Sequence, residues 1–162
     1  MNGFSRQGDN MKVCVQGLGF VGAAMSTAVS IAIDDSQNPL YDVIGVDLPN
    51  DTGMRRINAI NRGEFPFETS DKYLHESIKK ANLQGNLRAT TNPSVYSEAD
   101  IVVIDVQFDI SHLDDQPKLD LDCFKKSIQV IGRHVKPGTL ILVETTVPPG
   151  TCEKVVIPIL HS

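Results

Sequence analysis

Residues 13–25 read VCVQGLGFVGAAM, in which a short apolar strand pattern is followed by three glycines and then by small and apolar residues. The glycines have the spacing Gly17-x-Gly19-x-x-Gly22. The first permits a tight turn, the second leaves bare backbone where a pyrophosphate can approach, and the third lets the following helix press against the strand. Backbone N–H groups at the start of that helix would face the phosphates. The stretch predicts a dinucleotide-binding loop, and an ordinary tight turn is the alternative.

An acidic residue at the end of the second strand pattern supports the dinucleotide. Residues 41–48 read YDVIGVDL, and Asp47 stands where the fingerprint has a carboxylate that accepts hydrogen bonds from the adenosine ribose. A turn-rich insertion at residues 34–39 lengthens its separation from Gly17. A carboxylate repels a 2′-phosphate and so favours NAD over NADP, but Arg55 or Arg56 would accommodate that phosphate. A methyltransferase sheet also has an acid at this point; the glycine spacing and the FVGAA segment favour the dinucleotide.

Strand and helix patterns alternate along the chain. We expect strands at residues 12–16, 41–48, 87–92, 100–106 and 139–147, and helices at residues 21–33, 53–63, 71–83, 121–135 and 150–160. Ser70 or Asp71 would cap the third helix, Pro93 opens a short helix, and the acidic residues 107–118 would form a loop. The alternation predicts an α/β fold with a doubly wound, mostly parallel, Rossmann-like sheet and the strand order 3-2-1-4-5. Residues 11–162 would form this single domain, and residues 1–10 a flexible extension.

Composition excludes several classes of function. The chain has 162 residues, is 41% hydrophobic and 6% aromatic, and lacks Trp, which suits a parallel sheet with an aliphatic core. The net charge of −5 argues against nucleic acid and anionic membranes as partners. No apolar run approaches the roughly 20 residues that cross a bilayer, and residues 1–10 lack the apolar block of a signal peptide. We therefore expect a cytoplasmic protein.

The cysteines and histidines predict no metal site and no disulfide. The three cysteines, Cys14, Cys123 and Cys152, form no CxxC pair, and the four histidines are scattered. Cys14 lies within the first strand pattern and should be a small buried hydrophobic residue.

A second informative stretch is VETTVPPGT, residues 143–151, in which two threonines follow an apolar strand pattern and Pro-Pro-Gly forces a turn. The end of this strand would border the same crevice as the glycine loop. Thr145 or Thr146 would then offer a hydroxyl near the nicotinamide end of the cofactor. Threonine is also a common strand residue, so these residues alone leave the question open.

Taken together, five segments resemble the N-terminal domain of the UDP-glucose/GDP-mannose dehydrogenase family, the nucleotide-sugar 6-dehydrogenases. They are KVCVQGLGFVGAAM, VIGVDL, RRINAINRGEFPFE, ATTNPSVYSEADIVVIDV and ETTVPPGT, and the resemblance spans residues 12–160. It implies an enzyme of polysaccharide biosynthesis that oxidises the C6 alcohol of a UDP- or GDP-sugar to a carboxylate with two NAD. A stand-alone NAD(H)-sensing module and the cofactor domain of another hydroxyacid-type dehydrogenase are the alternatives.

The resemblance also implies roles for individual residues. The family's pyrophosphate loop is matched by Gly17, Gly19, Phe20, Val21 and Gly22. Asp47 matches the family's ribose-binding acid, and Arg56 matches a basic residue beside the adenosine. Thr146 matches a threonine near the reacting centre that helps to position a water, and is the candidate catalytic residue. Val106 and Thr145 are expected to contact the cofactor as well.

Two departures from the family pattern bear on these expectations. Where the family commonly has Val-Pro-Thr-Pro, residues 106–109 read VQFD, which puts one threonine contact in doubt. The family's sixth strand, its sugar-nucleotide domain and its catalytic cysteine would follow Ser162. We therefore expect a chain truncated before that strand, which binds NAD but does not catalyse alone. Its nucleotide-sugar substrate would bind through the missing domain, and the full-length form would be a homodimer.

Overall fold

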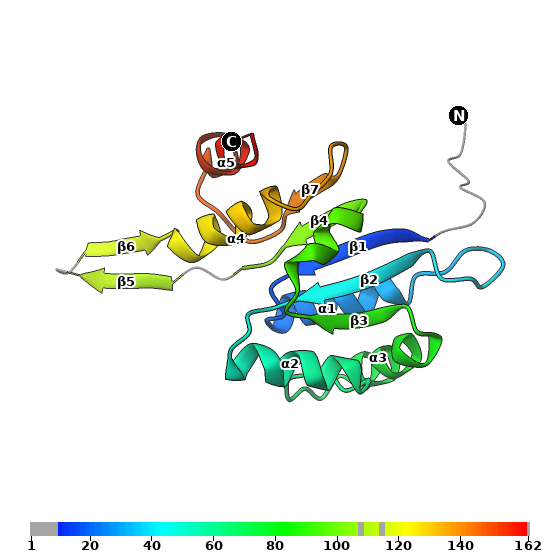
Figure 1. Cartoon of the computed structure of the whole chain (residues 1–162). Coiled ribbons are helices and arrows are strands. Elements are labelled where there is room, and N and C mark those ends of the chain that lie inside the picture. Colours follow the sequence, from blue (N-terminus) through cyan, green and yellow to red (C-terminus); the bar gives the residue numbers. More distant parts are fainter. Residues whose placement is uncertain (1–9, 107–108, 114–115, 162) are drawn as a thin grey trace.

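The computed structural model describes residues 10–106, 109–113 and 116–161. Its main sheet has five strands in the order β3-β2-β1-β4-β7, and every neighbouring pair is parallel, as Figure 1 shows. The strands are β1 (Met11–Gln16), β2 (Tyr41–Val46), β3 (Leu87–Thr90), β4 (Ile101–Ile104) and β7 (Leu140–Val143). This order confirms the predicted doubly wound, Rossmann-like fold. The expected extension at residues 1–10 lies, except for Asn10, outside the described residues.

Helices cover both faces of the sheet. One face packs against α1 (Phe20–Ser30), α2 (Asp51–Asn61) and α3 (Lys72–Gln84); the other packs against the 3-10 helix η1 (Pro93–Glu98), α4 (Asp122–Gly132), the π-helix η2 (Cys152–Val156) and α5 (Ile157–Leu160). Successive β1 residues alternate between the two cores, with Val13 and Val15 in the first and Cys14 in the second. Both cores are mainly aliphatic, as the composition predicts.

The chain changes direction at β1, and this creates the crevice. It proceeds from β1 outward to β2 and β3, then returns to β4 on the other side of β1. The connections that leave the carboxyl ends of β1 and β4 therefore run in opposite directions. The crevice that opens between them is the place where doubly wound sheets bind ligands. The segments beyond these strand ends are held in place, because the N–H of Gly17 donates to the carbonyl of Val46 at 2.8 Å and that of Asp105 to the carbonyl of Gln16 at 2.8 Å.

Cys14 is fully buried, as predicted, with 0% of its surface exposed. Its thiol donates to the carbonyl of Val95 at 3.8 Å. Burial raises the pKa of this thiol to about 12, so it stays uncharged at neutral pH. Cys14 therefore acts as a packing residue.

Local capping fixes where the helices begin and end. The carboxylate of Asp71, rather than Ser70, accepts hydrogen bonds from the N–H groups of Tyr73 and Leu74 and so starts α3. Helix α1 ends at Ser30, earlier than predicted, because residues 34–39 form a compact turn. In that turn the Asp34 carboxylate accepts the N–H groups of Ser36 and Asn38, each at 2.8 Å.

The acidic residues 107–118 were expected to form a loop, and this prediction is wrong. Residues Asp109–Leu113 (β5) and Gln116–Asp120 (β6) pair as an antiparallel two-stranded sheet. Figure 1 shows this pair extending away from the main sheet beyond the start of α4. Two antiparallel strands are joined by backbone hydrogen bonds, so their side chains need not form an apolar run. A charged segment can therefore pair in this way without a strand pattern in its sequence.

The last predicted strand and helix are also shorter or less regular than expected. β7 ends at Val143, before the two threonines. The final helical segment is divided into η2 and α5, with Pro158 near the start of α5. Proline cannot donate to the preceding turn and its ring crowds that turn's carbonyl, which explains the wider π-turn before it. Within the described ranges, no helix is both long enough and apolar enough to span a membrane.

Candidate cofactor-binding site

The three glycines of the loop at residues 17–22 are needed for two different reasons. Gly17 has a φ of 94°, and a Cβ there would lie 2.2 Å from the backbone oxygen of Asp105. A Cβ on Gly22 would lie 1.9 Å from the backbone oxygen of Gly17. Gly19 has an ordinary φ of −57°, and a Cβ there would meet nothing within 4 Å. Packing therefore requires glycine at the first and third positions, whereas at the second it leaves space open in front of α1.

The amino-terminal end of α1 carries no side-chain cap from its own residues. Gly19 is the N-cap residue, and its carbonyl accepts the N–H of Ala23 at 2.9 Å. The carboxyl of Asp105, which follows β4, faces the N–H of Gly22 in the first turn, and this hydrogen bond lowers the carboxyl's pKa. Partial burial has the larger, opposite effect, so the pKa of Asp105 is raised overall. The first turn of α1 thus offers a backbone N–H to an acceptor outside the helix, which is the feature that helix termini use to bind anions.

The carboxylate of Asp47 is positioned at the end of β2 by two contacts. Oδ1 accepts the N–H of Leu48 at 2.8 Å, and Oδ2 accepts Nη1 of Arg56, on α2, at 3.2 Å. The Arg56 guanidinium lies 5.4 Å from the centre of the Phe67 ring. Its Nε is buried and has no hydrogen-bond partner among the described residues. A buried donor without a partner favours a ligand acceptor beside it.

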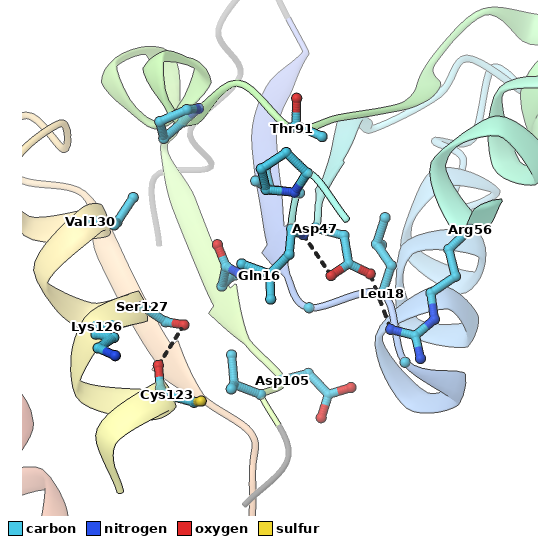
Figure 2. Close-up of a pocket in the computed structure, with 17 residues that line it drawn as sticks. Gln16, Leu18, Asp47, Arg56, Thr91, Asp105, Cys123, Lys126, Ser127 and Val130 are labelled. Atoms are coloured by element: carbon cyan, nitrogen blue, oxygen red, sulfur yellow. Dashed lines mark hydrogen bonds and ion pairs between the residues drawn. The ribbon is translucent and has the colours of Figure 1, made fainter. Parts of the chain in front are cut away.

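A single cavity of about 520 Å³ joins these features (Figure 2). Its size is in the range of small-molecule and cofactor sites. One side is formed by the glycine loop and the ends of β1 and β2, and the opposite side by α4, from which Cys123, Lys126, Ser127 and Val130 line the space. The residues after β3 and β4 complete the lining with Thr91, Pro93, Asp105 and Val106.

The structure brings together part of the predicted set. Gly17, Gly19, Asp47, Arg56 and Val106 all line the cavity. The cavity lining does not include Gly22, whose backbone packs against Gly17, or the exposed residues Phe20 and Val21.

The two predicted threonines also lie outside the cavity lining. The hydroxyl of Thr145 donates to the carbonyl of Ile104 at 3.2 Å, and Thr146 is exposed. The VQFD departure begins at Val106, and residues 107 and 108 lie outside the described residues.

Sequence reasoning missed several residues of the cavity. Gln16 ends β1 and Asp105 directly follows β4, and both line the cavity. Doubly wound sheets bind ligands at the carboxyl ends of their strands, so this rule could have identified both residues from the sequence. The α4 residues at positions 123, 126, 127 and 130 have helical spacing and share one face, next to the buried face of Phe124, Ile128 and Ile131. Only packing against the sheet shows that this second face borders the cavity.

The cavity-lining Cys123 and the other exposed cysteine, Cys152, are free thiols. Among the described residues, no group of three or more His, Cys, Asp or Glu side chains is arranged to hold a metal ion.

Replacing Asp105 by asparagine is expected to stabilise the fold at neutral pH. The pKa of Asp105 is raised in the folded state, so ionisation of this carboxyl costs stability as the pH rises above its ordinary value of 3.8. Asparagine keeps an acceptor for the N–H of Gly22 and cannot ionise. Asp105→Asn should therefore unfold at a higher temperature than the wild type at pH 7, and the two melting temperatures should converge as the pH falls toward 4.

The neighbouring carboxyl of Glu144 provides an internal check on this prediction. Burial and the charge of Asp105 both raise the pKa of Glu144. The Asp105→Asn variant should lower that pKa, which carboxyl chemical shifts followed by NMR would measure. A stability difference that does not vary with pH would show that the charge of Asp105 is not its cause.

Comparisons with known proteins agree with this geometry. Residues 11–162 match the sequence model of the UDP-glucose/GDP-mannose dehydrogenase family, NAD binding domain. The chain is 34% identical over 155 residues to a UDP-N-acetyl-D-mannosamine dehydrogenase of Methanocaldococcus jannaschii, which covers 96% of this chain and 33% of that protein. It is 32% identical over 142 residues to the enzyme of the same name from Escherichia coli, covering 88% of this chain and 29% of that protein.

Solved structures give the same result. An NDP-N-acetyl-D-galactosaminuronic acid dehydrogenase from Methanosarcina mazei superposes with a TM-score of 0.83 at 28% identity, covering 96% of this chain and 31% of that one. A ternary complex of GDP-mannose dehydrogenase from Pseudomonas aeruginosa superposes with a TM-score of 0.75 at 27% identity, covering 93% and 32% of the two chains.

The chain spans about a third of the length of the curated relatives it matches. The matched portion begins at β1, includes the glycine loop and Asp47, and continues through α5. The chain therefore belongs to the UDP-glucose/GDP-mannose dehydrogenase family and is its NAD-binding domain.

Proposed function

We propose that the cavity between the glycine loop and α4 is the NAD site of this domain. The diphosphate would lie over the bare backbone at Gly17 and Gly19, where the first turn of α1 attracts negative charge. The adenosine ribose would lie at Asp47, whose carboxylate oxygens retain further lone pairs for the ribose hydroxyls. The observation that carries the proposal is Gly19, which lines this cavity and at which an added Cβ would meet nothing within 4 Å.

Arg56 supports this placement from the adenosine side. It bonds to Asp47 through Nη1, while its buried Nε has no partner among the described residues and is free to donate to a ribose oxygen. The Phe67 ring under the guanidinium holds it in that orientation. The residues present therefore fit a dinucleotide with a diphosphate and an adenosine ribose.

For the complete protein we infer the oxidation of the C6 alcohol of a UDP- or GDP-sugar to a carboxylate with two NAD. The support is that similar proteins are named UDP-N-acetyl-D-mannosamine dehydrogenase and GDP-mannose dehydrogenase. When bound, NAD supplies the hydride acceptor. The role of this domain is to hold the cofactor in one orientation, with Thr146 near the reacting centre as the proposed water-positioning residue. A homodimeric, cytoplasmic enzyme remains part of this proposal.

Titration of the 162-residue chain with NADH tests the cofactor site directly. We expect a saturable change in nucleotide fluorescence, or a saturable heat in calorimetry, with no oxidation of added nucleotide sugars by the chain alone. The resemblance places the family's catalytic cysteine outside the segments matched here, which is the reason for expecting binding without turnover. No saturable signal at millimolar NADH would overturn the proposed site.

Replacing Asp47 by alanine is expected to weaken NADH binding about 10- to 100-fold, the cost of losing hydrogen bonds to a charged acceptor. The substitution also frees the Nη1 group of Arg56 and removes the charge that repels a 2′-phosphate. NADPH should therefore lose less affinity than NADH, which parallel titrations would measure. Asp42→Ala is the matched control, since Asp42 lies near the opposite end of β2 and outside the cavity lining. Equal losses in the two Asp variants would contradict a ribose contact.

A further inference from the structure

Gln16 is a polar side chain in a position that packing alone does not explain. It is the last residue of β1, and its neighbours in the sheet are Val46 and Ile104. Only 7% of its surface is exposed, yet it lines the cavity. Burying an amide among apolar residues is costly unless its polar atoms are hydrogen-bonded. The chain thus places a hydrogen-bonding group in the interior wall of the cofactor cavity.

A buried tyrosine fixes the orientation of this amide. The hydroxyl of Tyr96, from η1, donates to Oε1 of Gln16. Tyr96 is completely buried, and burial raises the pKa of its phenol above the ordinary value, so the hydroxyl keeps its proton and remains a donor. With Oε1 bound to Tyr96, the Nε2 group of Gln16 remains, and it donates to no acceptor among the described residues. Figure 2 shows Gln16 between Asp47 and the α4 side chains Ser127 and Val130.

The surroundings indicate what this amide would meet. With the diphosphate at the glycine loop and the ribose at Asp47, the base extends into the remaining part of the cavity. Pro93, Val106 and Val130 give that part apolar walls suited to the faces of a purine. The edge of a purine carries ring nitrogens that accept hydrogen bonds, and a glutamine amide donates to such acceptors.

We propose that Gln16, oriented by Tyr96, is a specificity-determining residue that donates from Nε2 to a ring nitrogen of the adenine base. The proposal rests on the NAD site described above and adds recognition of the base to it. Tyr96 acts as a positioning residue, because it touches Gln16 rather than the ligand. The alternative is that Gln16 serves only to satisfy the buried Tyr96 hydroxyl.

The test uses ADP-ribose and its 1-deaza, 3-deaza and 7-deaza analogues, each of which replaces one ring nitrogen by C–H. Their affinities for the 162-residue chain are measured by displacement of NADH. One analogue should bind about tenfold more weakly than ADP-ribose, and the other two should bind with similar affinity. This identifies the nitrogen that accepts from Gln16.

The same four ligands are then compared on two variants of Gln16 and on Tyr96→Phe alone. Gln16→Leu combined with Tyr96→Phe removes both polar partners together, so no buried group is left unpaired and the fold should be retained. Gln16→Glu keeps the acceptor for Tyr96 but removes both N–H donors. In each Gln16 variant ADP-ribose should bind about tenfold more weakly than in the wild type, and the preference over the sensitive analogue should disappear. Thermal unfolding of each variant verifies that it is folded.

The possible outcomes separate the two proposals. If the wild type binds NADH and ADP-ribose but distinguishes none of the analogues, or the variants keep the wild-type preference, base recognition by Gln16 is wrong and the NAD site stands. If the wild type binds neither ligand, the proposed site fails and this inference fails with it. If Tyr96→Phe binds ADP-ribose more weakly and its preference over the sensitive analogue is reduced but not abolished, the positioning role of Tyr96 is confirmed. If the affinity and the preference are both unchanged, Gln16 recognises the base without help from Tyr96, and the positioning role is wrong.

Discussion

Gly19→Val is expected to abolish detectable NADH binding while leaving the fold intact. The backbone at Gly19 has a φ of −57° that any residue can adopt, and a Cβ there would meet nothing within 4 Å. The valine side chain would instead fill the space in front of α1 where the diphosphate is proposed to lie. We expect a loss of at least about 100-fold in affinity, equivalent to losing two hydrogen bonds to a charged group. NADH titration measures the loss, and thermal unfolding measures the fold.

Two further glycine variants make this result interpretable. Gly19→Ala adds a single methyl group at the same place and should weaken binding less than valine does. Gly22→Ala forces a Cβ to within 1.9 Å of the backbone oxygen of Gly17, so this variant should lose thermal stability as well as binding. Wild-type affinity in a folded Gly19→Val variant would show that the diphosphate does not approach this backbone.

Phe124→Ala is expected to lower the free energy of unfolding by about 3–5 kcal/mol, the usual cost of truncating a fully buried aromatic residue. Phe124 is 0% exposed and belongs to the core between α4 and the sheet. The same helix carries Ser127 and Val130, which line the cavity, so its position also sets the width of the proposed cofactor site. Urea unfolding monitored by circular dichroism measures the loss.

The matched control for this prediction lies on the same helix. Gln129 is exposed, and Gln129→Ala should change the free energy of unfolding by no more than about 0.5 kcal/mol. If Phe124→Ala were as mild as Gln129→Ala, α4 would not be packed against the sheet as described.

Some features could be predicted from the sequence because their signals are local. The glycine spacing, the acid after the second strand and the alternation of strands and helices each lie within short segments. They were sufficient for the strand order and for the placement of Gly17, Gly19 and Asp47 at the crevice. A helix cap at Ser70 or Asp71 is another example, since the partners of Asp71, Tyr73 and Leu74, are only two and three residues away.

Other features gave weak or misleading local signals. The charged residues after β4 were interpreted as a loop, but antiparallel pairing of β5 with β6 depends on backbone partners that the side-chain pattern does not specify. The hydroxyl of Thr145 donates to the carbonyl of Ile104, a partner that the motif does not specify, and its contact with the cofactor stays a prediction. A motif indicates which side chains are present and leaves their hydrogen-bond partners undetermined.

By itself, the sequence determined the doubly wound sheet, the glycine loop and the acid beside it, because spacing along the chain fixes turns, helix faces and strand ends. The tertiary structure alone decided that Asp105 faces the first turn of α1, that Tyr96 holds Gln16 in the cavity wall, and that a second face of α4 lines the cavity. These residues come from segments far apart in the sequence. Which of them share a cavity depends on how the helices pack on the sheet, and no local pattern records that packing.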